Sequence, residues 1–111
     1  MPTPVIVGAA RTAIGRSFKG ALVNTAPETL ITTVLPEVVR RSGVDPAEID
    51  DIIFAESHYG GGDLARYAAD ATGLTDIPGQ SVNRHCAGSL TAIGNASAQI
   101  GSGMERVLIA G

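Results

Sequence analysis

The chain has 111 residues, of which 44% are hydrophobic, 4% aromatic and 17% charged, and its net charge is -3 at pH 7. This length suits one small domain, whose core has to be built from aliphatic side chains and alanine because the chain contains no Trp. The negative charge, without any cluster of basic residues, argues against a nucleic-acid partner. The single cysteine, Cys86, excludes an internal disulfide and fits a reducing compartment.

Two segments of the sequence indicate whether the protein is secreted or inserted in a membrane. Residues 1–15 (MPTPVIVGAARTAIG) lack a basic flank followed by a long apolar run, so they do not predict a secretory signal. Residues 86–104 carry no charge, but their many Ser, Thr, Asn, Gln and Gly residues make them too polar for a membrane span. We therefore expect a soluble, cytoplasmic protein with no membrane partner.

The first part of the chain predicts a strand, a loop and a helix. Pro4 to Ala9 (PVIVGA) is a short apolar run of strand character, and residues 11–24 form a Gly-containing loop. Thr25 and Glu28 have the spacing of a capping box, which predicts the start of a helix that ends at Gly43. One face of this helix is apolar: Leu30, Ile31, Val34, Leu35, Val38 and Val39.

Strands and helices alternate through the rest of the chain. Asp45 begins a short turn, and Asp63 stands where a cap for the next helix is expected. The expected elements are a strand over 51–57, a helix over 64–72, a strand over 80–84, a helix over 87–102 and a strand over 106–110. This order predicts an α/β fold with a mainly parallel sheet.

The expected helix over residues 87–102 is unusual in composition. It contains several Gly, Ser and Thr residues, which weaken an isolated helix, and it lacks a charged face for solvent. Small residues let neighbouring backbones approach closely, so we expect this helix to be enclosed on more than one side. A sheet of 111 residues with one helix layer on each face leaves such a helix half exposed. We therefore expect the chain to be the N-terminal portion of a larger protein.

Cys86 stands at the junction between the expected strand and this helix. The unpaired N–H groups and the positive end of the helix dipole favour the thiolate form of a nearby cysteine. A thiolate is the nucleophile that acyl transfer needs, and Ala87, Gly88 and Ser89 are small enough to leave its approach open. The alternative is that Cys86 is a small buried hydrophobic residue, as most lone cysteines are. Position alone leaves both interpretations open.

Several ordered segments carry a resemblance to a known family. They are PVIVGAARTAIG, GVDPAEIDDIIFAES, GGDLARYAADATGL and IPGQSVNRHCAGSLTAIGNASAQIGSGMERVLIAG. Together they resemble the thiolase family of acyl-CoA C-acyltransferases, and VNRHCAGSL resembles the nucleophile motif of that family. The likeness covers essentially the whole chain, residues 1–111, but corresponds only to the first part of a longer family chain, without its loop domain and C-terminal half.

The resemblance implies a role, substrates and an architecture. The cysteine that matches Cys86 takes an acyl group from an acyl-CoA or 3-ketoacyl-CoA as a thioester, and passes it to coenzyme A or a second CoA thioester. The backbone N–H of Cys86 is then expected to help bind the oxyanion. Coenzyme A thioesters are substrates, with no tightly bound cofactor. The family fold stacks two α/β halves in five layers, with this cysteine's helix in the central layer, and forms homodimers or homotetramers.

The sequence departs from the family in two ways. The family usually has Ser and then Gly two and three residues after the cysteine, whereas this chain has Gly88 and then Ser89. The family's catalytic His and second Cys, and most of its CoA contacts, lie in later motifs that this chain lacks. We therefore expect the chain by itself to be inactive.

Two other functions stay open at this stage. A 3-ketoacyl synthase shares the fold and an equivalent cysteine, and later segments with two histidines and no second cysteine would favour it. A non-catalytic thiolase-like subunit is the other, in which the order Gly88-Ser89 marks a relaxed site.

Other conspicuous residues have simpler explanations. Residues 60–65 (GGGDLA) fit a dinucleotide-binding pattern, but Asp63 places negative charge where a pyrophosphate would lie. We expect His85 to serve the backbone rather than catalysis, His58 to belong to a loop, and Arg84 to form a structural ion pair. One Cys and two separated His residues give no metal-ligand set.

Overall fold

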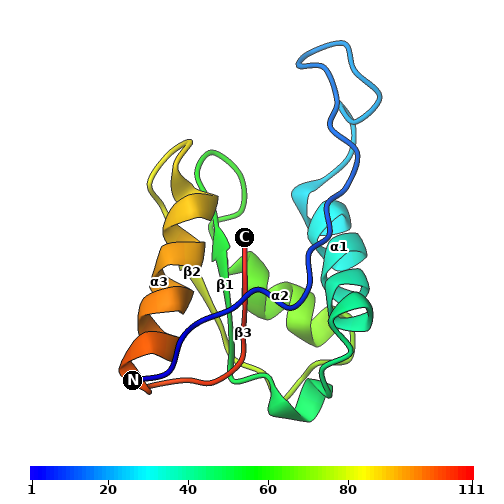
Figure 1. Ribbon diagram of the computed structural model, residues 1–111. Helices are drawn as coiled ribbons and strands as arrows, with labels where there is room; N and C mark the ends of the chain where they lie inside the picture. Colours follow the sequence, from blue (N-terminus) through cyan, green and yellow to red (C-terminus); the bar gives the residue numbers. More distant parts are fainter.

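The computed structural model describes residues 1–111. Its elements in chain order are α1 (Pro27–Ser42), the 3-10 helix η1 (Pro46–Glu48), β1 (Asp51–Ala55), α2 (Leu64–Ala71), β2 (Gly79–Val82), α3 (Gly88–Ser102) and β3 (Leu108–Ala110) (Figure 1). Each expected strand and helix after residue 26 is present within a few residues of its expected bounds. The expected α/β fold is confirmed.

The three strands form one parallel sheet with the order β2-β1-β3. Ile52 of the central strand lies opposite Gly79 of β2 and Ile109 of β3. A central parallel strand is covered on both faces, which suits its run of apolar residues, DIIFA. The expected parallel sheet is confirmed.

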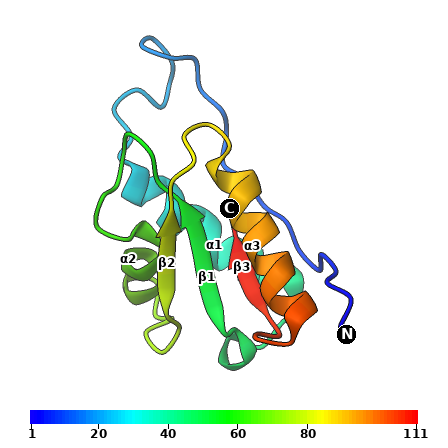
Figure 2. The ribbon, with the colours of Figure 1, turned by 90° about the vertical axis from the view of Figure 1, so that its left-hand side faces the viewer.

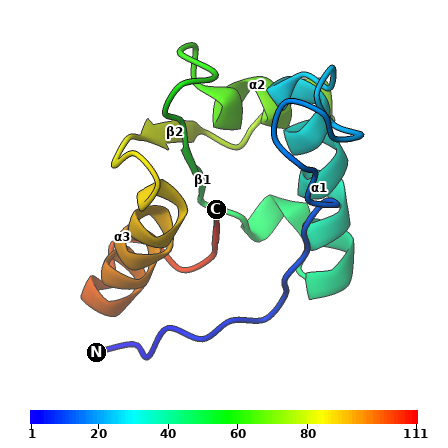
Figure 3. The same ribbon diagram turned by 90° about the horizontal axis from the view of Figure 1, so that it is seen from above.

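Helices cover both faces of the sheet. Figure 3, a view from above, shows α3 on one side and α1 and α2 on the other. Because neighbouring side chains of a strand point to opposite faces, Ile52 packs toward α1 and α2, and Ile53 packs toward α3. Both isoleucines are fully buried, and each such side chain stabilises the fold by about 1.5–3 kcal/mol.

Local signals in the sequence define several element ends. Gly43 ends α1 in the left-handed conformation, with φ of 69°. The Asp45 carboxylate accepts a hydrogen bond from the Ala47 N–H at 3.0 Å and starts η1. These features confirm the ends expected from the sequence.

The expected capping box at the start of α1 is wrong. The residue that precedes the helix is Ala26 rather than Thr25, and no side chain caps the helix. Pro27 occupies the first helical position instead, where its missing N–H costs nothing and its fixed φ suits a helix. The proline sets the start, so the helix begins without a side-chain cap.

The expected strand over Pro4–Ala9 is also wrong. Residues 1–26 contain no strand, and Val5, Ile6 and Val7 are 72%, 83% and 60% exposed. Figure 3 shows this segment passing from the α3 side to the α1 side beyond the edge strand β3. None of its backbone groups pairs with β3, and a strand exists only where a neighbour supplies these hydrogen bonds. The apolar sequence pattern of a strand is present in residues 4–9, but no neighbouring strand forms backbone hydrogen bonds with these residues in this chain.

Helix α3 is covered on one side by this chain. Gly88, Ala92 and Ala96 are buried toward the sheet, whereas Leu90 is 75% exposed and Ile93 44% exposed. The enclosure expected from its composition is therefore not supplied by these 111 residues and stays a prediction. None of the helices combines the length and apolar character that crossing a bilayer requires.

Candidate functional site

The turn over residues 83–87 joins β2 to α3 at the carboxyl end of the parallel sheet (Figure 2). The loop over residues 57–63, which follows β1, lies at the same end of the sheet. In open α/β sheets ligands bind beyond the carboxyl ends of the strands. Cys86 lies in this turn as a free, exposed thiol, so the interpretation of Cys86 as a buried hydrophobic residue is wrong for this chain.

Hydrogen bonds fix the path of this turn. The Asn83 side-chain oxygen accepts from the His85 N–H at 3.0 Å, and His85 adopts a left-handed conformation with φ of 47°. The carbonyl oxygen of Arg84 accepts from the Ala87 N–H at 3.0 Å, and that of His85 accepts from the Gly88 N–H at 3.2 Å. A left-handed non-glycine residue costs about 1–2 kcal/mol, and such strain is concentrated at functional sites.

Cys86 lies immediately before the N-cap residue of α3. The helix starts at Gly88, Ala87 precedes it as the N-cap, and no side chain caps the helix. The expected start at Ala87 is therefore one residue too early, because Ala87 belongs to the turn. The Gly88 N–H donates to the His85 carbonyl, whereas the N–H groups of Ser89 and Leu90 have no acceptor in this chain and are available to an anion.

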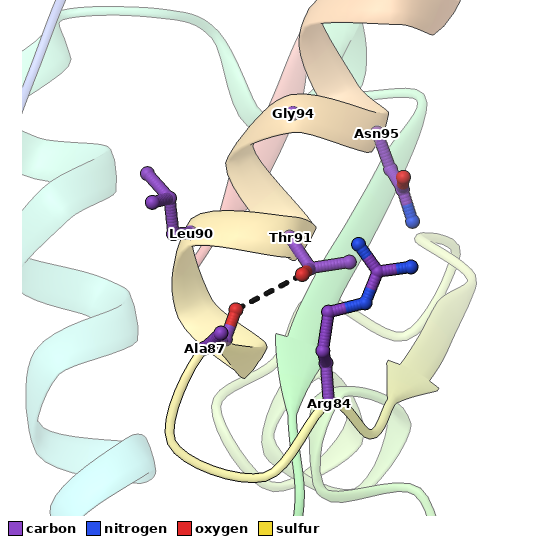
Figure 4. Close-up of a pocket in the computed structure, with 6 residues that line it drawn as sticks. All are labelled: Arg84, Ala87, Leu90, Thr91, Gly94 and Asn95. Atoms are coloured by element: carbon purple, nitrogen blue, oxygen red, sulfur yellow. Dashed lines mark hydrogen bonds between the residues drawn. The ribbon is translucent and has the colours of Figure 1, made fainter.

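A shallow pocket of about 330 Å³ lies against the first turns of α3. Its lining residues are Arg84, Ala87, Leu90, Thr91, Gly94 and Asn95 (Figure 4). In Figure 4 the Arg84 side chain runs along the helix toward Asn95, and the Thr91 hydroxyl donates to the Ala87 carbonyl at 2.9 Å. Cys86 is not among the lining residues, so the pocket flanks the thiol without containing it.

Arg84 forms no ion pair within the chain, contrary to the expected structural ion pair. Its positively charged side chain instead lines the pocket beside the turn over residues 83–87. Sequence reasoning also did not identify Thr91 or Asn95, whereas Asn83 belongs to the motif VNRHCAGSL that it did identify. The Asn three residues before Cys86 carried a signal, since Asn often accepts from the backbone two residues later.

The loop over residues 57–63 is held by two carboxylates. The Glu56 side chain accepts from the N–H groups of Gly61, at 2.9 Å, and Leu64. The Asp63 side chain accepts from the Arg66 N–H at 3.1 Å, which confirms its expected role as the cap of α2. The N-terminus of α2 is thus occupied by carboxylates of the chain itself, which is a physical reason against a pyrophosphate there.

These hydrogen bonds also change the acidity of Glu56. Burial raises the pKa of Glu56, but hydrogen bonds from the Leu64 and Gly61 N–H groups and from Ser81 outweigh it, so the pKa lies below its ordinary value. Glu56 is therefore a structural carboxylate that stays ionised at neutral pH.

The two histidines do not join Cys86 in a catalytic arrangement. His58 is exposed in the loop after β1, as expected, and no hydrogen bond links it to Cys86. The His85 backbone N–H and carbonyl take part in the turn, and the role expected for its side chain stays a prediction. No three His, Cys, Asp or Glu side chains lie close enough together to hold a metal ion.

The sequence of the chain also matches a known family and several named proteins. Residues 4–111 match the family described as "Thiolase, N-terminal domain". The chain is 38% identical, over 89% of its length, to 3-ketoacyl-CoA thiolase 5, peroxisomal, of Arabidopsis thaliana, and covers 22% of that protein. It is 35% identical, over 99% of its length, to an acetyl-CoA acetyltransferase of Rhizobium meliloti, and covers 28% of that protein.

A solved structure agrees with the sequence matches. The crystal structure of the Bacillus anthracis acetyl-CoA acetyltransferase superposes with a TM-score of 0.89 at 38% identity, covering 96% of this chain and 28% of that one. The chain thus spans less than a third of the length of these relatives. The sheet, the three helices and the match of residues 4–111 to the N-terminal domain of the family lead to one conclusion: the chain belongs to the thiolase family.

Proposed function

We propose that the protein carrying this chain is an acyl-CoA C-acyltransferase in which Cys86 holds the acyl group as a thioester. The observation that carries this proposal is the placement of Cys86 as an exposed thiol in the turn before α3. The turn stands at the carboxyl end of a parallel sheet, in a chain of the thiolase family. The names of the relatives, acetyl-CoA acetyltransferase and 3-ketoacyl-CoA thiolase, support the reaction class.

In the proposed reaction the Cys86 thiolate attacks the carbonyl carbon of an acyl-CoA or 3-ketoacyl-CoA. The negative charge that develops on the carbonyl oxygen needs preorganised donors, and the open N–H groups at the start of α3 are suited to that task. Collapse of the adduct breaks the C–S bond of an acyl-CoA and releases coenzyme A, or breaks the C2–C3 bond of a 3-ketoacyl-CoA and releases acetyl-CoA, and the leaving group takes up a proton. Coenzyme A, or the deprotonated α-carbon of a second CoA thioester, then attacks the Cys86 thioester and receives the acyl group. The thiolate is regenerated, so coenzyme A acts as a substrate and not as a tightly bound cofactor.

The remaining parts of the proposal concern the whole protein. A catalytic His, a second Cys and most CoA contacts belong to segments beyond these 111 residues, so the chain alone is inactive. The whole protein assembles as a homodimer or homotetramer and works in the cytoplasm. Two observations support a need for further segments: Cys86 is exposed in this chain, and the pocket that flanks it is shallow.

Alkylation of the full-length protein tests the proposal. Iodoacetamide is expected to label Cys86, and prior incubation with acetyl-CoA is expected to slow that labelling, because the acyl group occupies the sulfur. Peptide mapping by mass spectrometry gives the rate at Cys86. Labelling that acetyl-CoA leaves unchanged would contradict the thioester.

Substitution of the nucleophile provides a second test. Cys86→Ser is expected to reduce acyl transfer on the order of 10³-fold or more, because the hydroxyl is a far weaker nucleophile. Ser102→Ala is the matched control at the far end of α3, where the hydroxyl bonds only the Gln99 carbonyl. Its rate is expected to equal that of the unaltered protein. A Cys86→Ser protein that keeps its rate and its melting temperature would refute the proposed function.

A further inference from the structure

Gly88 is the buried residue in an otherwise exposed stretch over residues 83–90. A Cβ atom at position 88 would lie 2.7 Å from the Cβ of Ala55. Carbon atoms that are not bonded pack at about 3.5–4.0 Å, so no side chain fits at this position while Ala55 keeps its methyl group. The φ angle of Gly88 is not positive, so packing and not backbone conformation requires glycine here.

Ala55 is held on both sides and is unable to retreat from the helix. It is the last residue of β1, and its N–H donates to the Gly111 carbonyl at 2.8 Å. The next N–H, that of Glu56, donates at 2.9 Å to the carbonyl of Val82, the last residue of β2. A larger residue at position 88 would therefore move the helix and not the strand.

A displaced helix start would carry the nucleophile turn with it. Gly88 is bonded through its N–H to the His85 carbonyl, and Cys86 lies between these two residues. The contact between Ala55 and Gly88 thus sets the distance of the turn from the sheet. Displacements of about 1 Å at a reacting group lower rates on the order of 100-fold.

We propose that Ala55 and Gly88 form a matched pair that positions Cys86, and that Ala55 accounts for the order Gly88-Ser89 in the nucleophile motif. This inference rests on the proposed function in taking Cys86 as the nucleophile. In this chain a serine at position 88, where the usual family order places one, would bring its Cβ to 2.7 Å from the Cβ of Ala55. The reversed order therefore preserves the turn, and it does not mark a relaxed site.

A double-mutant cycle on the full-length protein tests the pair. The proteins are the unaltered one, Ala55→Gly, Gly88→Ser and the double variant, each measured for alkylation of Cys86 by iodoacetamide, for kcat and KM, and for melting temperature. Gly88→Ser is expected to lower kcat on the order of 100-fold, with a smaller change in KM. Adding Ala55→Gly to Gly88→Ser is expected to restore alkylation and kcat to within about twofold.

Gly101→Ala is the matched control, because it adds a Cβ to the same helix far from Cys86, at a position where no atom of these 111 residues lies within 4 Å. It is expected to leave alkylation and kcat unchanged. Gly88→Ser behaving as the unaltered protein would overturn the pair, and so would a double variant as impaired as Gly88→Ser. Where Gly88→Ser fails to fold, recovery of folding in the double variant supports the pair, and its failure to fold overturns it.

The outcome is separable from that of the proposed function. Alkylation of Cys86 and the melting temperature test the contact between Ala55 and Gly88 without requiring acyl transfer. The pair can therefore be supported or refuted even if the Cys86→Ser protein keeps its rate of acyl transfer. Conversely, a failed pair leaves the role of Cys86 untouched.

Discussion

Asp50 shows how one carboxylate joins two strands that are distant in the sequence. Its side chain accepts hydrogen bonds from the N–H groups of Arg106, at 2.7 Å, and Val107, at 2.9 Å. Its own N–H donates to the Val107 carbonyl at 2.8 Å. The N–H groups of Val107 and Arg106 hold the pKa of Asp50 below its ordinary value. Asp50 therefore fastens the start of β3 beside the start of β1.

Removing this carboxylate is expected to destabilise the protein in a pH-dependent way. Asp50→Ala is expected to lower the free energy of unfolding by about 1 kcal/mol at pH 7, allowing for solvent screening. Because the pKa of Asp50 is lower in the folded state, this contribution is present above the unfolded pKa of about 4 and is lost as the pH falls through the folded pKa.

The measurement is the difference in melting temperature between the unaltered and Asp50→Ala proteins from pH 7 down to pH 3. The difference is expected to shrink as the pH falls. Asp50→Asn keeps an acceptor oxygen without the charge, so its deficit is expected to be smaller and less dependent on pH. A deficit that stays constant over this range would contradict the linkage.

At the scale of elements, helix α2 depends on its N-terminal cap. Asp63 adopts a left-handed conformation with φ of 60° and accepts from the Arg66 N–H. The helix then buries Ala65, Ala68 and Ala69 completely against the sheet and α1. A negative side chain at this end also interacts favourably with the helix dipole.

Loss of this cap is expected to weaken α2. Asp63→Ala is expected to lower the free energy of unfolding by about 1 kcal/mol, since alanine offers no acceptor and tolerates a positive φ poorly. Asp63→Asn is the matched control, because asparagine caps helices and accepts the left-handed conformation. Chemical denaturation curves of the two variants give the comparison. Equal losses in both would assign the effect to charge instead of capping.

The elements also show what the sequence predicts well and what it does not. Ends defined by local chemistry, such as Gly43, Asp45 and Asp63, were predictable because the interacting atoms lie within a few residues. The strand expected at Pro4–Ala9 was not, because strand pairing depends on a distant partner.

The site was predictable to a similar extent. The position of Cys86 between strand and helix followed from the alternation of elements and from the family motif. The left-handed His85 and the contact between Ala55 and Gly88 did not, because they arise from the path of the turn and from packing between segments that are 33 residues apart (88 minus 55).

At the scale of the whole molecule, the core of this chain is small for its composition. Only 12 of 111 residues are buried, although 44% of the chain is hydrophobic. Exposed apolar side chains gather on the N-terminal segment, at Val5, Ile6 and Val7, and on the outer side of α3, at Leu90 and Ile93. Apolar surface of this kind favours association with other protein surfaces.

We therefore expect the 111-residue chain, expressed alone, to associate with itself and to bind an environment-sensitive hydrophobic dye. The full-length protein at the same concentration is the control and is expected to bind much less dye per chain. Light scattering and dye fluorescence provide the measurements. A monomeric chain with a sharp unfolding transition and no dye binding would show that its own core is sufficient.

The anchoring of the loop after β1 has a practical consequence for protein engineering. Glu56 holds the loop at Gly61 and again at Leu64, while the positions of Gly61 and Gly62 have open space around them. A peptide inserted between these two glycines would be flanked by both anchoring hydrogen bonds, so we expect the loop to accept an insertion with little loss of stability. Fluorescent or affinity labels placed there would report on the carboxyl end of the sheet without altering the turn that carries the thiol.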